Sequence, residues 1–120
     1  SGPLDPPSNA LRQASVGGDP AALYEMGSRT IEGRGVPRDA RAAVALFEKA
    51  AEKNFAPAQY RVGNAYEKGT GVTRDLETAR RWYQRAAENG NTRARHNRAV
   101  LLAEGTGAKR DYADAVGWVQ

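Results

Sequence analysis

Apolar residues recur along this chain at steps of three and four positions. Between residues 76 and 89 they form the i, i+3, i+4, i+7, i+8 series of a helix with one buried face: Ala79, Trp82, Tyr83, Ala86 and Ala87. The stretch from 40 to 51 has the same series: Ala43, Leu46, Phe47, Ala50 and Ala51. No β-branched stretch alternates with the period of two that a strand shows. The pattern therefore predicts helices and no sheet.

The sequence also matches itself at an offset of 36 residues without a gap. Six positions hold one residue type in all three copies: Gly33, Gly69 and Gly105; Gly35, Gly71 and Gly107; Arg38, Arg74 and Arg110; Asp39, Asp75 and Asp111; Ala43, Ala79 and Ala115; Ala22, Ala58 and Ala94. Such a period is typical of a repeat protein. One unit cannot bury its own apolar face, so each unit is stabilised by its neighbours.

Each unit is predicted to contain two helices, called here helix A and helix B. In the second unit helix A runs from about Ala56 to Lys68, and Gly69 follows where a left-handed C-cap is needed. Asp75 stands where its carboxylate can cap the start of helix B, which runs to about Asn89. Small residues such as Gly27 and Gly63 are expected where helices approach closely.

The unit boundaries follow from this register. Residues 1–8 are expected to be a linker, 9–18 a partial unit with helix B only, 19–55 the first unit, 56–91 the second and 92–120 a truncated third, all in one solenoid domain. A short helix is predicted near Asn9 to Val16. Because the third unit stops inside helix B without the polar cap of a natural solenoid end, we expect the native protein to continue beyond Gln120.

Composition narrows the picture only slightly. The chain has 120 residues, no cysteine and a net charge of +4, with a pI of about 9.7. The lack of cysteine excludes disulfides and thiolate metal sites. No apolar run reaches the roughly 20 residues of a membrane-spanning helix. A moderately basic surface favours an acidic partner, nucleic acid or an anionic envelope surface, without choosing between them.

Several strings of the second unit carry a family resemblance: residues 58–66 (AQYRVGNAY), 69–72 (GTGV), Trp82-Tyr83 and Ala86-Ala87-Glu88. They resemble the Sel1-like repeat, a relative of the tetratricopeptide repeats with a longer loop between helices A and B. The resemblance covers the chain from about Leu11. It implies an all-α fold, an α/α-solenoid forming a right-handed superhelix with the A helices on its concave side. It also implies binding of proteins or peptides, often in bacterial envelope biology and signalling.

A narrower resemblance is carried by residues 94–102 (ARHNRAVLL) together with Lys109, Asp111-Tyr112 and Trp118. These residues are similar to the repeat region of alphaproteobacterial polar localisation factors. That resemblance implies a role in cell polarity and a location in the bacterial periplasm.

The concave face predicts a contact surface. On helix A, positions i, i+4 and i+7 form one stripe, and residues 36 apart lie side by side on neighbouring A helices, which gives a ladder of Tyr24, Tyr60 and His96. Tyrosine offers a large contact area with one polar tip. The candidate partner-binding residues are Tyr24, Ser28, Tyr60, Arg61, Asn64, His96 and Asn97. The alternative interpretation is that the tyrosine rings only pack between helices.

Other chemistry has little support in the sequence. His96 is the only histidine, and no cluster of His, Asp or Glu accompanies it, so we expect neither a metal nor a catalytic role. The Gly-x-Gly loops lack the Gly-Lys-Ser/Thr of a phosphate-binding loop. The expectation is a protein that is not an enzyme, uses no cofactor, binds a protein or peptide rather than nucleic acid, and is a monomer.

Arginines supply the main alternative function. Seven lie in the second and third units: Arg74, Arg80, Arg81, Arg85, Arg93, Arg95 and Arg98. They could bind an anionic polymer, such as a peptidoglycan-associated glycan or nucleic acid, or they could be solvated helix faces. A third hypothesis is a structural spacer.

Arg98 departs from the repeat because Met26 and Val62 fill the equivalent positions of the first two units. Its side chain should therefore reach solvent or face a carboxylate.

Overall fold

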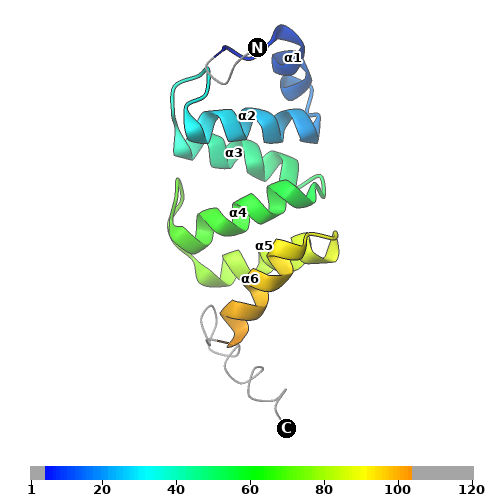
Figure 1. The fold of residues 1–120 in the computed structure, drawn as a ribbon, viewed down its shortest axis with the longest axis vertical. Helices are drawn as coiled ribbons and strands as arrows, with labels where there is room; N and C mark the ends of the chain where they lie inside the picture. The colour runs from blue at the N-terminus through cyan, green and yellow to red at the C-terminus, as the bar shows by residue number, and fades with distance from the viewer. Residues whose placement is uncertain (1–4, 104–120) are drawn as a thin grey trace.

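A computed structural model of the chain describes residues 5–103, and these residues form six helices and no strand. The helices are α1 (Asn9–Val16), α2 (Pro20–Glu32), α3 (Ala40–Ala51), α4 (Ala56–Lys68), α5 (Leu76–Glu88) and α6 (Thr92–Ala103). They stack along the long axis as successive antiparallel neighbours (Figure 1). The all-α solenoid is confirmed. The expectations for Gly105, Gly107, Arg110, Asp111, Ala115 and Trp118 lie outside the described residues.

The helix ends follow the capping chemistry predicted from the sequence. Gly69 closes α4 in the left-handed conformation, with φ of 72°, and its N–H donates to the Ala65 carbonyl. The Asp75 carboxylate accepts the Thr78 N–H at the start of α5. In both complete units an arginine of the loop donates through Nε to a carbonyl at the end of helix A, Arg38 to Ile31 and Arg74 to Glu67. The loop is therefore fastened to the helix it follows.

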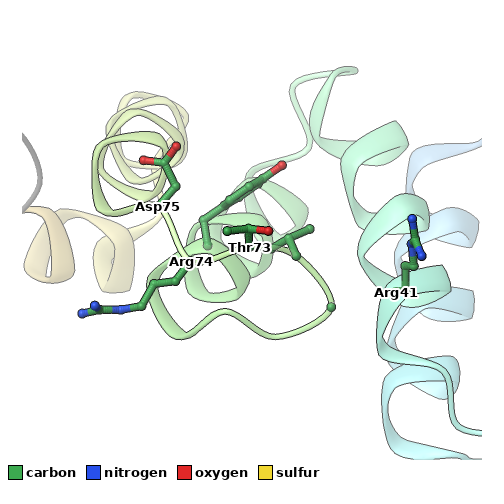
Figure 2. A pocket seen from close by; sticks show the side chains of 7 residues that line it. Arg41, Thr73, Arg74 and Asp75 are labelled. Carbon is green, nitrogen blue, oxygen red and sulfur yellow. The ribbon is translucent and has the colours of Figure 1, made fainter.

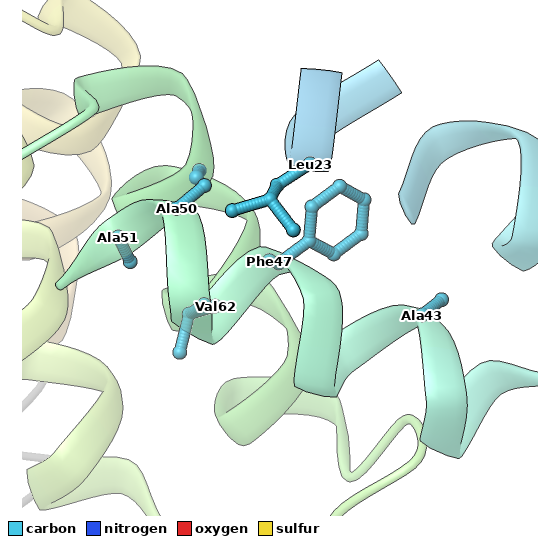
Figure 3. Packing of buried hydrophobic residues seen from close by; sticks show 7 residues of the cluster. Leu23, Ala43, Phe47, Ala50, Ala51 and Val62 are labelled. Carbon is cyan, nitrogen blue, oxygen red and sulfur yellow. The ribbon is translucent and has the colours of Figure 1, made fainter. Parts of the chain in front are cut away.

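The core lies between helices A and B of each unit and continues across the unit boundary. Phe47 projects from α3 towards α2, where it meets Leu23, and Val62 of α4 joins the same cluster (Figure 3). The predicted helix-B stripes are buried or half-buried throughout. Trp82, expected in the core, is half-buried and packs on this cluster, while the Arg85 guanidinium lies 4.6 Å from its ring centroid.

One buried polar side chain links consecutive units. Gln59 of α4 is fully buried; its Nε2 donates to the Ala51 carbonyl at 3.0 Å, and its Oε1 accepts from Asn89 Nδ2 at 2.9 Å. It therefore joins the carboxyl-terminal ends of α3 and α5. Both ends of the buried amide are hydrogen-bonded, and the bond to Ala51 crosses from the second unit to the first. This bond therefore helps to fix how one unit sits on the next.

Candidate interaction surface on the A helices

Three hollows surround α4 on the side of the A helices, α2, α4 and α6. The first hollow, of about 190 Å³, is lined by Ile31, Val44, Phe47, Arg61, Asn64, Ala65, Lys68 and Thr70. The second, of about 300 Å³, is lined by Tyr60, Asn64, Glu67, Lys68, His96, Asn97 and Val100. The third, of about 290 Å³, is lined by Tyr24, Pro57, Tyr60, Gly90, Asn91, Thr92 and Arg93. Shared residues make them neighbours: Asn64 and Lys68 border the first two, and Tyr60 borders the last two.

Most of the predicted contact residues come together here. The second hollow collects Tyr60, Asn64, His96 and Asn97 from two adjacent A helices. Tyr24 and Tyr60 both line the third hollow. The ladder therefore follows neighbouring hollows, with His96 as its exposed end.

One expectation needs revision, and one residue of this surface was not predicted. Ser28 was expected on the exposed stripe, but it is only 7% exposed and therefore offers a partner almost no surface. The adjacent Gly27 is also buried and lies against Phe47 of α3, so this part of α2 belongs to the interior of the helix stack. Lys68 was not predicted, although it borders two hollows. Its position eight residues after Tyr60 and seven after Arg61 could have indicated the shared face.

The tyrosine rings have structural contacts as well as an open side. The Tyr24 ring lies 5.6 Å from the rings of Phe47 and of Phe55, between centroids. The Tyr60 ring lies 6.0 Å from that of Tyr83. Both tyrosines are half-buried and also border a hollow. Packing fixes each ring in one orientation, so a partner would meet a pre-positioned aromatic surface at low entropic cost.

A buried tyrosine organises the floor of the second hollow. The Tyr83 hydroxyl approaches Asn64 Oδ1 at 2.7 Å and Glu67 Oε1 at 2.5 Å. The hydroxyl carries one proton, so the two acceptors compete for it, and the carboxylate has the shorter contact. Burial, reinforced by the hydrogen bond to Glu67, raises the pKa of Tyr83 well above its ordinary value. Glu67 and Asn64 are thereby held in place, and both residues line the second hollow.

A larger hollow, of about 720 Å³, lies elsewhere, between α3 and the loop of the second unit. Figure 2 shows Arg41 on α3 across this space from Thr73, while the Arg74 side chain extends away from Arg41. The cations therefore do not converge. Gly71 of the loop packs against α3, since a Cβ there would lie 2.6 Å from the Ala40 carbonyl oxygen. Close packing between units explains this glycine without a phosphate ligand.

The seven arginines do not form one surface. Arg80 is only 9% exposed, Arg81 pairs with Glu77 at 3.0 Å, and Arg85 stacks on Trp82. Arg98 is half-buried and lines a hollow that Glu88 also lines, but its buried Nε has no hydrogen-bond partner among the described residues. Among residues 5–103, no three His, Cys, Asp or Glu side chains gather as a metal site, and no helix is long and apolar enough to cross a membrane.

Comparisons with known proteins agree with this architecture. A family model described as Sel1 repeat matches residues 20–55, 56–91 and 92–120. A Sel1 repeat protein from Oxalobacter formigenes is 36% identical, with a TM-score of 0.80 over 91% of this chain and 45% of its own. The antigen c5321 of uropathogenic Escherichia coli strains, described as protective and as having an SLR fold, is 36% identical, with a TM-score of 0.82 over 90% of this chain and 23% of its own.

A more distant structure shows the fold alone. Helicobacter pylori cysteine rich protein B is 22% identical, with a TM-score of 0.69 over 72% of this chain and 65% of its own. No curated protein matched the chain. The chain spans less than half the length of the Oxalobacter and Escherichia proteins.

Proposed function

The chain belongs to the Sel1 repeat family, whose members are generally non-enzymatic protein-interaction scaffolds, and we propose that it binds a peptide or partner protein along its A helices. The observation that carries the proposal is the pair of hollows that meet at Tyr60. Three successive A helices contribute Tyr24, Tyr60 and His96 to them. Such a strip matches the way repeat solenoids present extended binding surfaces.

The biological setting is a second part of the same proposal. We propose that the scaffold acts as a monomer in the bacterial cell envelope, in the periplasm, in the organisation of a cell pole. The support is the similarity of residues 94–102 to repeat regions of polar localisation factors. A fluorescent fusion of the full native protein that distributes evenly through the cytoplasm would contradict this setting.

The alternative of an anionic polymer as ligand has weaker support. Arg81 is already paired, Arg85 is stacked, and Arg74 donates to the Glu67 carbonyl. The Glu77 carboxylate already neutralises part of the charge of Arg81, and Arg85 also donates to Asn54 Oδ1 of the first unit, so these side chains are partly committed to contacts inside the fold. A flat dependence of binding on salt would remove the alternative entirely.

The test compares capture of envelope proteins by the wild type and two variants. His96→Ala removes an exposed side chain of the second hollow, and Tyr60→Ala removes the residue shared by two hollows. Each should weaken binding, with Tyr60→Ala costing on the order of 1–3 kcal/mol in affinity. Lys49→Ala, on the exposed side of α3, is the control. Circular dichroism confirms that each variant keeps its helices. Equal capture by Tyr60→Ala and the wild type would move the site away from the A helices.

A further inference from the structure

The first and second hollows occupy equivalent positions at successive unit boundaries. Adding 36 to three residues of the first hollow, Ile31, Arg61 and Asn64, gives three residues of the second, Glu67, Asn97 and Val100. The groove is therefore repeated, but its side chains differ. The first hollow has a cation where the second has an amide, and an aliphatic side chain where the second has a carboxylate.

The first hollow has an apolar floor. Val44 and Phe47 lie beneath its base and are each only 1% exposed, while Ala65 and the half-buried Ile31 complete its apolar lining. Its volume of about 190 Å³ compares with the ~150 Å³ of an apolar cavity that accepts a benzene molecule. One aliphatic or aromatic side chain of a ligand fits such a space.

Cations without a protein anion border this floor. The Arg61 guanidinium lies 4.7 Å from the ring centroid of Phe47 and 5.9 Å from that of Tyr24, a cation–π arrangement that holds it over the hollow. Within residues 5–103 neither Arg61 nor Lys68 makes a hydrogen bond or an ion pair. A half-buried guanidinium with unused donors gains strongly from an incoming carboxylate.

The spacing of these groups indicates an extended ligand. Arg61, Asn64, Ala65 and Lys68 lie at i, i+3, i+4 and i+7, so they form one stripe on α4. Seven residues of helix span about 10 Å, which is the length of about three residues of an extended peptide. The apolar floor lies beside the middle of the stripe.

We propose that the first hollow binds an extended peptide segment in which an apolar side chain is flanked by acidic residues. The apolar side chain occupies the floor, and the carboxylates pair with Arg61 and Lys68. This inference rests on the proposed function and specifies the partner of the same surface. The second hollow shares Lys68 but has Asn97 in place of Arg61 and the Glu67 carboxylate in its lining, so the acidic preference belongs to the boundary between the first two units.

The experiment is a selection from a displayed library of random dodecapeptides. The wild type is compared with the double variant Arg61→Gln, Lys68→Gln. The matched control, Arg41→Gln, Lys49→Gln, removes two exposed cations of α3. Peptides selected by the wild type should be enriched in Asp and Glu around an apolar residue. Their dissociation constants should rise at least tenfold in the Arg61/Lys68 variant and less than twofold in the control.

Other outcomes overturn the inference in distinguishable ways. Selected peptides that bind through Tyr60 but show no acidic enrichment would refute the acidic partner and leave the scaffold function standing. An equal loss in the α3 control would show that only net charge matters. Recovery of no peptide above background would count against both proposals. Tighter binding of single-stranded DNA than of any selected peptide would replace the peptide with an anionic polymer.

Discussion

Phe47 and Tyr83 occupy the same position in consecutive units and differ by one oxygen atom. Both rings are almost fully buried, at 1% and 0% exposure, and both face a glycine of helix A. A Cβ at Gly27 would lie 2.7 Å from Phe47 Cε1, and one at Gly63 would lie 2.5 Å from Tyr83 Cε1. The helix pair is thus built in the same way in both units, around an aromatic ring that needs the space of a missing side chain.

The side chains around the two rings differ, and the polar neighbour belongs to the ring that has the hydroxyl. Where Tyr83 donates to Glu67, Phe47 has Ile31 at the equivalent position. Phe47 instead carries the Arg61 guanidinium over its ring face. The comparison teaches that the repeat keeps the backbone and the ring, while the side chain beside the ring changes together with the hydroxyl, from Ile31 beside Phe47 to Glu67 beside Tyr83.

The largest expected effect comes from removing the hydroxyl of Tyr83 or adding one to Phe47. Tyr83→Phe removes the hydroxyl partner of Glu67 and Asn64, and Phe47→Tyr buries a hydroxyl beside Ile31. Each should lower the free energy of unfolding by about 1–3 kcal/mol, because Tyr83→Phe deletes the hydrogen bond to Glu67 and Phe47→Tyr adds a buried hydroxyl without a partner. Urea unfolding monitored by circular dichroism measures both.

The comparison is sharpened by pairing each ring with its neighbour. The double variant Phe47→Tyr, Ile31→Glu should be more stable than the sum of its single changes predicts, by about 1 kcal/mol, because the hydroxyl regains a carboxylate. Strict additivity would show that the two residues vary independently, and the link between ring and hollow would be lost.

The second effect is a loss of stability in alkali that depends on Tyr83. Burial first, and then the hydrogen bond to Glu67, raise the pKa of Tyr83 above the ordinary value of about 10. Below pH 10 folded and unfolded chains both retain the proton. Above it the unfolded chain loses the proton while the folded chain keeps it, so stability falls by about 1.4 kcal/mol per pH unit.

Unfolding measured from pH 9 to 12 checks this dependence. Tyr83→Phe should show a shallower decline than the wild type, although Tyr66, whose pKa is raised by burial and by Glu48, adds a share to both. Tyr24→Phe removes a hydroxyl outside this network and serves as the control. Parallel slopes for the wild type and Tyr83→Phe would mean that the phenol is not protected in the folded state.

The smallest expected effect is a difference in melting temperature between variants of the two equivalent N-cap residues, Asp39 and Asp75. The Asp39 carboxylate accepts from the Ala42 N–H, whereas Asp75 accepts from both the N–H and the hydroxyl of Thr78. These two bonds from Thr78 lower the pKa of Asp75. Asp75→Ala should therefore reduce the melting temperature more than Asp39→Ala.

Acid should remove that difference. The contribution of the Asp75 carboxylate is complete above the ordinary Asp pKa of about 4 and is lost as pH falls towards its lowered pKa. Melting temperatures of the two variants at pH 7 and pH 2 make the comparison. Equal melting temperatures at pH 7 would show that the Thr78 hydroxyl adds nothing to the cap.

Local features were predictable because they depend on neighbouring residues in the chain. The predicted bounds of α1 and α4 agree with the structure, and so do the left-handed cap at Gly69 and the N-cap at Asp75. The close approach at Gly27 and Gly63 was also predicted. One hollow is lined by Tyr60, Asn64, His96 and Asn97, as their shared position in the repeat indicated. The predicted exposure of Ser28 was wrong. The width of a buried stripe depends on the neighbouring helices, and residue spacing alone does not describe them.

What the sequence determined by itself is the period, the helices and their caps, since these follow from helical geometry and a fixed offset. The tertiary structure alone decided that Tyr83 holds Glu67 and Asn64, that Arg61 rests on Phe47, and that Lys68 borders two hollows. Those contacts join side chains from different helices, and their distances depend on how closely the units pack. Packing of that kind is a collective property of all the side chains at a boundary, so no single stretch of sequence encodes it.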